Sequence, residues 1–336
     1  MFKHILILVV VFSLALGACA PATPKPTATV AVVAGEKTNK ELQNGKPFRM
    51  AGANRQHSFY RLLWLGITDA CRDLDVLCED SGYVGTEISP MAGSVDTMIA
   101  TGTSGMLTGV DKQVYAPIQK MVDAGIPVMS IHTITPEGDV PGLIGWVAPN
   151  PVAYSQECAN VLGAKINGKG TVAITQNTLN DIENAAASAF TAEMKAKYPD
   201  VVVLSPELET SDPIVAIGVA TAILQKHPDL AAAFGTTAYS PVTWGKALQA
   251  VGQKPGQTIV IGMDPLQENL DMVRDGWIYA IIAQPVYEEA YRAIELLVAH
   301  LRGEPVAYQN YYPSPIVYKD GIQKYYDRAK QVTSGE

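Results

Sequence analysis

Short apolar runs alternate with stretches of helical period along the chain from residue 47 onward. Residues 258–261 (TIVI) are typical of a strand covered on both faces, whereas apolar positions in 286–302 recur with a period near 3.6. The pattern predicts strands at 48–53, 76–79, 105–109, 127–131, 171–175, 201–204, 231–234, 258–263 and 278–283, and helices at 60–74, 95–101, 114–124, 183–198, 214–226, 242–251, 267–274 and 286–302.

Repeated strand–helix units predict an α/β fold built on parallel sheets. The folded part, from about Pro47 to the end, has about 290 residues, which is long for one domain and comfortable for two. We therefore expect two doubly wound lobes with roughly five strands in each. Ligands of such sheets bind beyond the carboxyl ends of the strands.

The first eighteen residues have the pattern of an export signal. Lys3 and His4 precede an apolar run at 5–16, and Leu-Gly-Ala leads into Cys19. The run is well short of the roughly 20 residues needed to span a bilayer. The cysteine after Leu-Gly-Ala resembles the bacterial lipobox, which implies cleavage before Cys19 and lipidation of it; the alternative is an ordinary signal peptide with a chance cysteine. We expect a protein exported and lipid-anchored to the cell membrane, facing the periplasm or the cell exterior.

Residues 19–46 read as a flexible tether between the anchor and the folded part. The segment is rich in Pro, Thr and Ala, and 21–27 reads PATPKPT. Prolines at that density favour extended, unpacked chain. A short strand at 30–33 is the alternative, although no nearby segment would pair with it.

Composition and motifs exclude several classes of function. The formal charge of −8 argues against a nucleic-acid surface. No CxxC, HExxH, GxSxG or dinucleotide fingerprint occurs, and 163–170 (GAKINGKG) lacks the Ser or Thr of a phosphate loop and precedes a strand instead of following one. We expect no enzyme activity, no cofactor and no bound metal.

Three cysteines remain after Cys19. Cys71 falls late in a predicted helix and Cys78 near the end of the next strand. In an exported protein these two form a disulfide or remain as two free buried thiols. Cys158 is expected to be a core residue on a helix.

Polar and aromatic side chains follow most of the predicted strands. Each alone is ordinary, because polar residues cap helices after strands. Together, aromatic faces with planar amides and carboxylates are what a sugar needs for its apolar faces and hydroxyls. The strand-end residues of this kind are Gln56, His57, Phe59, Tyr60, His132, Thr133, Asn150, Asn184, Thr237, Tyr239, Asp264 and Gln284.

The chain resembles the type 1 periplasmic binding proteins of the ribose- and galactose-binding class, the solute receptors of sugar ABC importers. The resemblance rests on 124–128 (AGIPV), 261–264 (IGMD), 275–285 and 301–306 (LRGEPV). It implies an N-terminal lobe of 47–148 and 285–313, a C-terminal lobe of 149–284 and 314–336, and hinge crossings near 148–149, 284–285 and 312–315.

The resemblance also assigns roles to individual residues. It implies that Gln56, His57, Phe59 and Tyr60 hold the sugar, that Asp264 matches the family's aspartate, and that Gln284 matches its amide before proline. The sequence departs from the family at three places. After the strand at 127–131, this chain has His132-Thr133 where the family has Asp-Arg or Asp-Ser. Residues 184–188 lack the family's usual arginine, and Asn184, Glu183 or Asp181 would take its place. After Phe234, Thr237 or Tyr239 stands in for the family's amide.

These observations predict a lipid-anchored, monomeric binding protein of an ABC importer. Two lobes would close over a monosaccharide, or a related polyol or furanose, and deliver it to the permease with its ATPase. The main alternative is a receptor that feeds a chemosensory or two-component system, and a weaker one is a surface hydrolase. No nucleic acid partner is expected.

Overall fold

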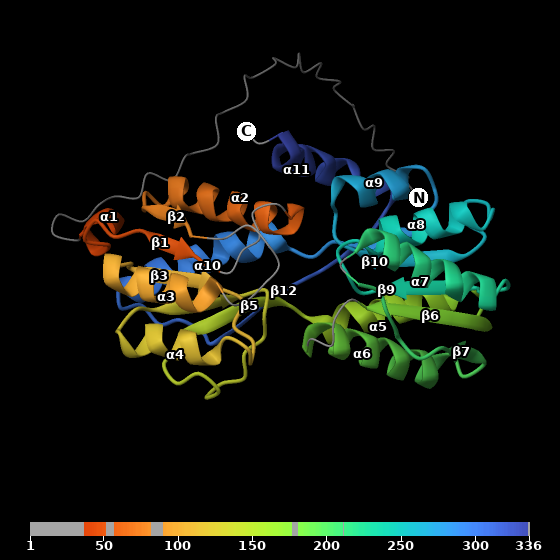
Figure 1. Cartoon of the computed structure of the whole chain (residues 1–336), viewed down its shortest axis with the longest axis horizontal. Coiled ribbons are helices and arrows are strands. Elements are labelled where there is room, and N and C mark those ends of the chain that lie inside the picture. Colours follow the sequence, from red (N-terminus) through yellow and green to blue (C-terminus); the bar gives the residue numbers. More distant parts are fainter. Residues whose placement is uncertain (1–36, 52–56, 82–89, 177–180, 211, 335–336) are drawn as a thin grey trace, which may run out of the picture. The chain divides into compact units, whose positions relative to one another are not determined.

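The computed structural model describes residues 37–51, 57–81, 90–176, 181–210 and 212–334 (Figure 1). The predicted signal peptide, Cys19 and most of the predicted tether lie outside these ranges, as does Gln56. Within the described ranges no helix combines the length and apolarity that a membrane crossing needs.

The first lobe is built on a six-stranded sheet in which every neighbouring pair is parallel. Its order is β2-β1-β3-β4-β5-β12. These strands are β1 (Phe48–Met50), β2 (Cys78–Asp80), β3 (Gly105–Thr108), β4 (Val128–Ile131), β5 (Gly145–Pro149) and β12 (Gln309–Tyr312).

The second lobe is built on a seven-stranded sheet of order β7-β6-β9-β10-β11-β13, with the two-residue β8 also paired to β6. Only its last strand, β13, runs antiparallel to its neighbour. The strands are β6 (Gly170–Gln176), β7 (Val201–Val203), β8 (Glu207–Leu208), β9 (Ala232–Gly235), β10 (Ile259–Met263), β11 (Ala280–Ile282) and β13 (Ile316–Tyr318).

Both lobes repeat one doubly wound topology. When the two-residue β8 is left out of the numbering, the first five strands of each lobe have the order 2-1-3-4-5, and the sixth comes from the carboxyl-terminal part of the chain. The chain passes between the sheets after β5, after β11, and between β12 and β13. The predicted fold class is therefore confirmed, with longer sheets than the five strands expected per lobe.

Each predicted helix is found among those that cover the sheets, whereas the helices at 39–42, 151–165 and 323–334 were not predicted from the periodicity. In the first lobe they are α1 (Asn39–Leu42), α2 (Ser58–Asp73), α3 (Pro90–Thr101), α4 (Tyr115–Asp123) and α10 (Val286–Leu301). In the second they are α5 (Pro151–Lys165), α6 (Asp181–Lys197), α7 (Pro213–Lys226), α8 (Ser240–Ala250) and α9 (Gln267–Arg274). The last helix, α11 (Gln323–Ser334), packs against both α2 and α9.

Helices α2 and α10 pack closely against each other, although more than 200 residues separate them in the sequence (Figure 1). Gly66 makes this approach possible, because a Cβ at this position would overlap the carbonyl oxygen of Tyr287 and lie 3.1 Å from the Cβ of Ala290. Leu63, Ile67 and Ile294 are buried in the same core. This packing fixes α10, whose first turn carries a residue of the candidate site.

The folded part begins earlier than the predicted tether boundary at Lys46. Thr38 and Glu41 form a capping box that starts α1. The side chain of Gln43 then accepts from the backbone N–H of Leu77 at 2.7 Å and donates to its carbonyl at 2.9 Å. These bonds extend the edge of the sheet beside β2, so residues 37–46 belong to the first lobe.

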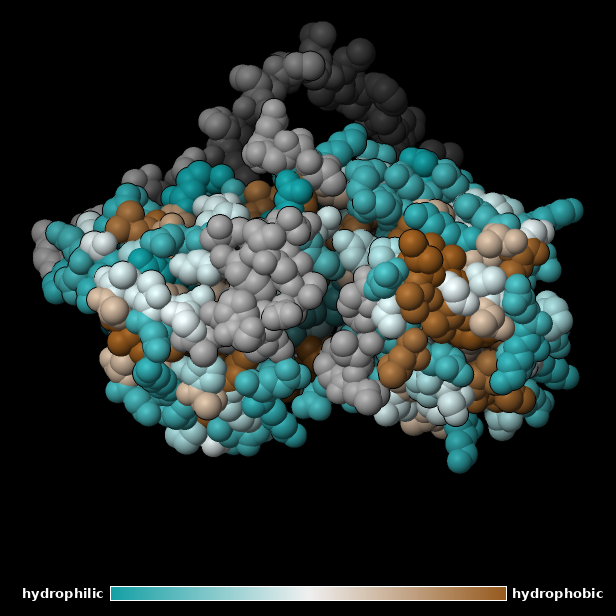
Figure 2. All heavy atoms as spheres, viewed as in Figure 1, coloured by the Kyte–Doolittle hydropathy of each residue, from teal (hydrophilic) through white to brown (hydrophobic). Residues whose placement is uncertain are grey.

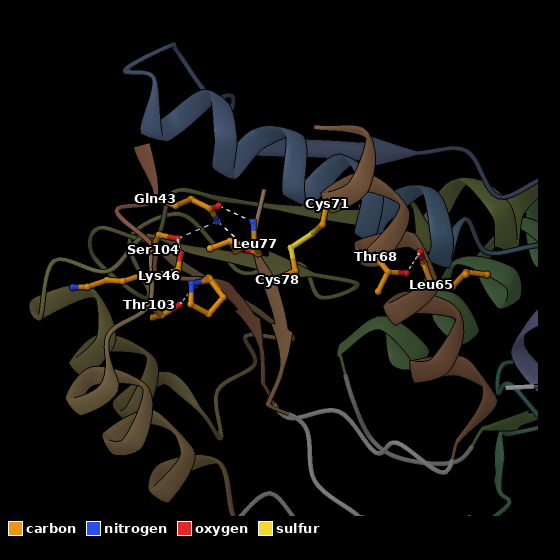
Figure 3. Close-up of a disulfide and its surroundings, with 10 residues drawn as sticks. Gln43, Lys46, Leu65, Thr68, Cys71, Leu77, Cys78, Thr103 and Ser104 are labelled. Atoms are coloured by element: carbon orange, nitrogen blue, oxygen red, sulfur yellow. Dashed lines mark hydrogen bonds between the residues drawn. A yellow bond between two sulfur atoms is a disulfide. The ribbon is translucent and has the colours of Figure 1, made fainter. Parts of the chain in front are cut away.

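Cys71 and Cys78 are joined by a disulfide, with their Cα atoms 6.2 Å apart (Figure 3). The bond ties the last turns of α2 to the start of β2. Gln43 contacts the same stretch of chain through Leu77, as Figure 3 shows. Cys158 is a buried free thiol on α5, in the core of the second lobe.

Large apolar side chains remain on the surface of the second lobe. The face seen in Figure 2 is brown where α7 and the neighbouring strands lie. Ile214 is 82% exposed, and Val202, Leu208 and Val215 are also exposed. Contiguous apolar surface of this kind often marks a contact with another molecule.

A cavity of about 240 Å³ lies beside the crossings between the lobes. Its lining combines both later crossings with α2, α10 and α11. Arg328 of α11 pairs with Glu288 at 2.6 Å and stacks 3.9 Å from the ring centre of Tyr287. The carboxyl-terminal helix is thus fixed against the first turn of α10 at the edge of this cavity.

Candidate functional site

The topology itself indicates where a ligand binds. In a doubly wound sheet the crevice opens at the carboxyl ends of the strands, where the strand order reverses. That point lies between β1 and β3 in the first lobe and between β6 and β9 in the second. Among the described residues, His132 follows β4 and Asp264 follows β10, at this edge of the two sheets.

Four aromatic rings gather at the amino end of α2. His57 is the N-cap, and its Nδ1 accepts from the backbone N–H of Phe59 at 3.1 Å. Its ring centre lies 5.9 Å from Tyr60 and 4.9 Å from Tyr239 of the second lobe. Burial lowers the pKa of His57, so this ring is neutral at pH 7. Tyr239 and His57 thus make an aromatic contact between the lobes.

His132 follows β4 and is held in an unusual backbone conformation. Its φ is +57°, in the left-handed region that is uncommon for residues other than glycine and in which Asn, Asp and His are the most frequent exceptions. Its ring meets Phe59 edge to face at 4.8 Å, and its Nδ1 lies 2.8 Å from Oε2 of Glu289. Burial lowers the pKa of His132, but Glu289, with a smaller effect of Asp264, outweighs it and the pKa is raised.

Asp264 follows β10 and repeats this geometry in the second lobe. Its φ is +66°, and its N–H donates to Ile282 at 2.9 Å, as the N–H of His132 donates to Val147 at 2.8 Å. In both cases the acceptor belongs to the fifth strand of the lobe. His132 and Asp264 therefore occupy equivalent positions of the two lobes. Strained backbone at such paired positions is a feature of functional sites.

The Asp264 carboxylate is almost fully buried and incompletely bonded. The residue is 2% exposed, and its Oδ1 has no hydrogen-bond partner. Its pKa is raised to about 7, chiefly by burial, which His132 opposes and Glu289 reinforces. Helix α9 begins only at Gln267 with Leu266 as N-cap, so Asp264 does not cap it. A buried acceptor without a donor is costly, so Asp264 is a candidate to accept a hydrogen bond from a ligand.

Glu289 is the most important site residue that the sequence pattern did not single out. It lies in the first turn of α10, is 0% exposed, and its Oε1 has no hydrogen-bond partner. Burial raises its pKa, and the interaction with His132 lowers it in part. The signal was present, because Glu289 interrupts a helical stripe of apolar residues that includes Val286, Ala290 and Ala293.

A third buried carboxylate belongs to the second lobe. Glu209 is 2% exposed and accepts hydrogen bonds from the hydroxyls of Thr237 and Ser240. Its Oε2 has no partner, and burial raises its pKa. Thr237, which the sequence proposes as a ligand residue, is thus held by an acidic side chain that the sequence did not predict.

The remaining predicted residues have other contacts in the structure, and their role at a ligand stays a prediction. Asn150 caps α5 by accepting from the N–H of Ala153 at 3.1 Å. Asn184 accepts from Gln176 at 3.1 Å. Thr133 lies against Gly109, where its Oγ1 occupies the space of a Cβ. Gln284, 8% exposed, lines the cavity beside the crossings.

Substitution of Phe59 by alanine is expected to weaken ligand binding by roughly 1–3 kcal/mol, the scale of a stacked, desolvated aromatic contact. Phe59 is partly exposed, and its ring stands nearly perpendicular to that of His132 at the carboxyl-terminal edge of the first sheet. Calorimetric titration combined with a melting curve checks this result. A large fall in Tm with unchanged affinity would instead make Phe59 a core residue.

Comparison with known proteins identifies the family. A model of the periplasmic binding protein domain matches residues 49–305, which is most of the chain and includes strands of both lobes. The chain belongs to this family. It is therefore a binding protein and not an enzyme, and its family is one of exported proteins.

Individual relatives of this periplasmic binding protein are distant. A xylitol-binding protein of Mycolicibacterium smegmatis is 24% identical over 252 residues, covering 70% of this chain and 67% of its own. A D-ribose/D-allose-binding protein of Pseudomonas aeruginosa is 26% identical over 229 residues, covering 65% of this chain and 70% of its own.

Solved structures share its fold. A glucose-galactose binding protein of Geobacillus stearothermophilus superposes with a TM-score of 0.75 at 22% identity, covering 83% of this chain and 99% of the other. This likeness extends over both lobes, as expected from the repeated topology. It supports the fold, and the ligand has to be argued from the site.

Proposed function

We propose that this protein is the lipid-anchored substrate-binding component of an ABC importer for a monosaccharide or a related polyol. The observation that carries the proposal is the unpartnered, buried carboxylate oxygen of Asp264, in the lobe opposite the aromatic rings at the start of α2. Asp264 has an unpartnered, buried carboxylate oxygen, and Phe59, Tyr60 and His57 lie on the facing lobe. Polyols need both a strong acceptor for hydroxyl groups and an apolar surface for C–H groups.

Relatives support the same class of ligand. The two curated relatives are named for xylitol and for D-ribose or D-allose, all neutral polyhydroxylated compounds. The contact between Tyr239 and His57 joins the lobes at the rim of the site. A ligand that bonds to both lobes would favour this closed arrangement by its differential affinity for it.

A thermal-shift panel tests the proposal. The panel contains xylitol, D-ribose, D-allose, D-galactose and L-arabinose at millimolar concentration, with wild-type protein and the Asp264→Asn variant. A ligand at about a thousand times its Kd adds about 4 kcal/mol of stability. We expect one or more of these compounds to raise the Tm of the wild type, and the variant to respond less. No response to any of them, or turnover of a bound compound, would contradict the proposal.

Substitution Cys19→Ser is expected to release the protein from membranes without changing its ligand affinity. Anchoring by acyl chains requires the thiol, whereas the ligand site lies in the folded lobes. Fractionation of cells, followed by a binding assay on the released protein, checks both parts. Retention of the variant on membranes would show that the anchor is not at Cys19.

A further inference from the structure

We propose that Glu289 binds the ligand directly and makes the site select against anionic compounds. The inference rests on the proposed function and names the charge class of its ligands. It adds to the site a residue on the first turn of α10, outside the strand ends.

The first argument is hydrogen bonding. Glu289 presents two buried oxygens, of which Oε2 is 2.8 Å from His132 and Oε1 has no partner. On the other lobe, Asp264 presents Oδ1 in the same condition. Each unpartnered carboxylate oxygen demands a donor, because a desolvated charged acceptor is costly to leave unbonded. One acceptor from each lobe is the arrangement that a compound with several hydroxyl donors satisfies.

The second argument is the internal repeat of the fold. Helices α5 and α10 each follow the fifth strand of a lobe and cross into the other lobe. Tyr154 is the fourth residue of α5, and Glu289 is the fourth residue of α10. Asp264 is an electrostatic neighbour that raises the pKa of Tyr154, and Glu289 is an electrostatic neighbour that raises the pKa of His132. The first turn of each crossing helix therefore faces the residue after the fourth strand of the lobe that it enters.

The third argument is charge. Glu289 raises the pKa of Asp264, and His132, which is positively charged when protonated, lowers the pKa of both carboxyl groups. Two carboxylates against one imidazolium leave the site negative when all three are ionised. A ligand carboxylate or phosphate would add a further like charge in a buried place, where such contacts are weakly screened. Neutral polyols avoid this cost.

The test compares neutral probes with acids of the same carbon skeleton. Titration calorimetry at pH 8 measures xylitol against D-xylonate, D-ribose against D-ribonate, and D-allose against D-allonate. We expect each acid to bind about a hundredfold more weakly than its neutral counterpart, the size of one like-charge contact in a partly screened site.

Variants of neighbouring residues locate the selectivity. Glu289→Gln is expected to reduce the neutral-to-acid ratio at least tenfold, whereas His132→Gln, which removes the positive charge, is expected to increase it. Glu288→Gln is the matched control, because the adjacent side chain loses the same charge but pairs with Arg328. The control ratio should equal that of the wild type.

The outcomes separate this inference from the proposed function. Binding of neutral probes with an unchanged ratio in Glu289→Gln would make Glu289 a structural partner of His132 and overturn the inference alone. Equal binding of acids and neutral probes by the wild type would do the same. If Glu289→Gln fails to fold, the ratio in His132→Gln decides, and a decrease there overturns the inference. Binding of no probe at all would overturn the proposed function and the inference with it.

Discussion

Asp264→Asn should make the ligand-free protein more stable while weakening ligand binding at least roughly tenfold, the loss of about one charge-assisted hydrogen bond. Burial raises the pKa of Asp264 from 3.8 to about 7. Asparagine has the same size and carries no charge, so it removes the cost of ionising a buried carboxyl group. The substitution should thus lower the affinity for the ligand and raise the free energy of unfolding by changing a single atom.

The raised pKa of Asp264 determines in which direction the stability of the wild type changes with pH. The folded pKa is raised, so folding is favoured by protonation below pH 3.8, and this stabilisation is lost as the pH rises to about 7. The wild type should therefore lose about 4 kcal/mol of unfolding free energy through Asp264 between pH 4 and pH 8, and the variant should not. The raised pKa values of Glu289 and His132 act in the same direction; Asp264 contributes only the smaller part of the shift of His132, so most of both effects is present in both proteins.

Denaturant titration of both proteins at several pH values measures the effect. The advantage of the variant should be small at pH 4 and should grow with pH, to about 4 kcal/mol at pH 8. An advantage that does not change with pH would show that Asp264 is not a buried titrating group. Unaltered affinity in the same variant would remove Asp264 from the ligand site.

Gly66→Ala should destabilise the protein by up to about 3 kcal/mol, the cost of overpacking a tight interface. The new methyl group would overlap the carbonyl oxygen of Tyr287, which belongs to the backbone of α10 and has no alternative rotamer. Because α10 carries Glu289, its displacement should weaken ligand binding as well.

Gly218→Ala is the control for this substitution. Gly218 is also a helical glycine, on α7, and a Cβ there has no atom within 4 Å. Alanine at this position should stabilise the protein by about 0.5–1 kcal/mol through its helix propensity. Melting curves of the two variants should shift in opposite directions. Equal shifts would mean that the α2–α10 contact tolerates a side chain.

Much of the fold follows from local pattern. Helix α9 spans the predicted 267–274, and α7 and α10 differ from prediction by one residue at one end. The sequence was less informative where elements are short and depend on distant partners. Residues 39–42 form a helix because Thr38 and Glu41 form a capping box and Gln43 bonds to Leu77. A helix of this kind has no hydrophobic periodicity from which it could be predicted.

Some residues of the candidate site could likewise be predicted from the sequence, and others could not. Asp264 and His132 directly follow strands, so parallel topology alone predicts their place. Glu289 and Glu209 lie on a helix and in a loop, and their importance depends on burial against residues far away in the sequence. Asn150 and His57 show the opposite difficulty, because both cap helices in the structure. The sequence does not distinguish a polar residue that caps a helix after a strand from one that contacts a ligand.

The position of α11 makes this helix suitable for attaching a fluorescent dye that reports movement of the lobes. The helix contacts α2 of one lobe and α9 of the other, so rotation of one lobe against the other must move it across at least one of them. Asp327 is exposed on this helix, Cys158 is buried, and Cys71 and Cys78 are bonded to each other. In a Cys19→Ser background, a thiol-reactive dye on Asp327→Cys would therefore label one position. Its emission would follow ligand binding in real time.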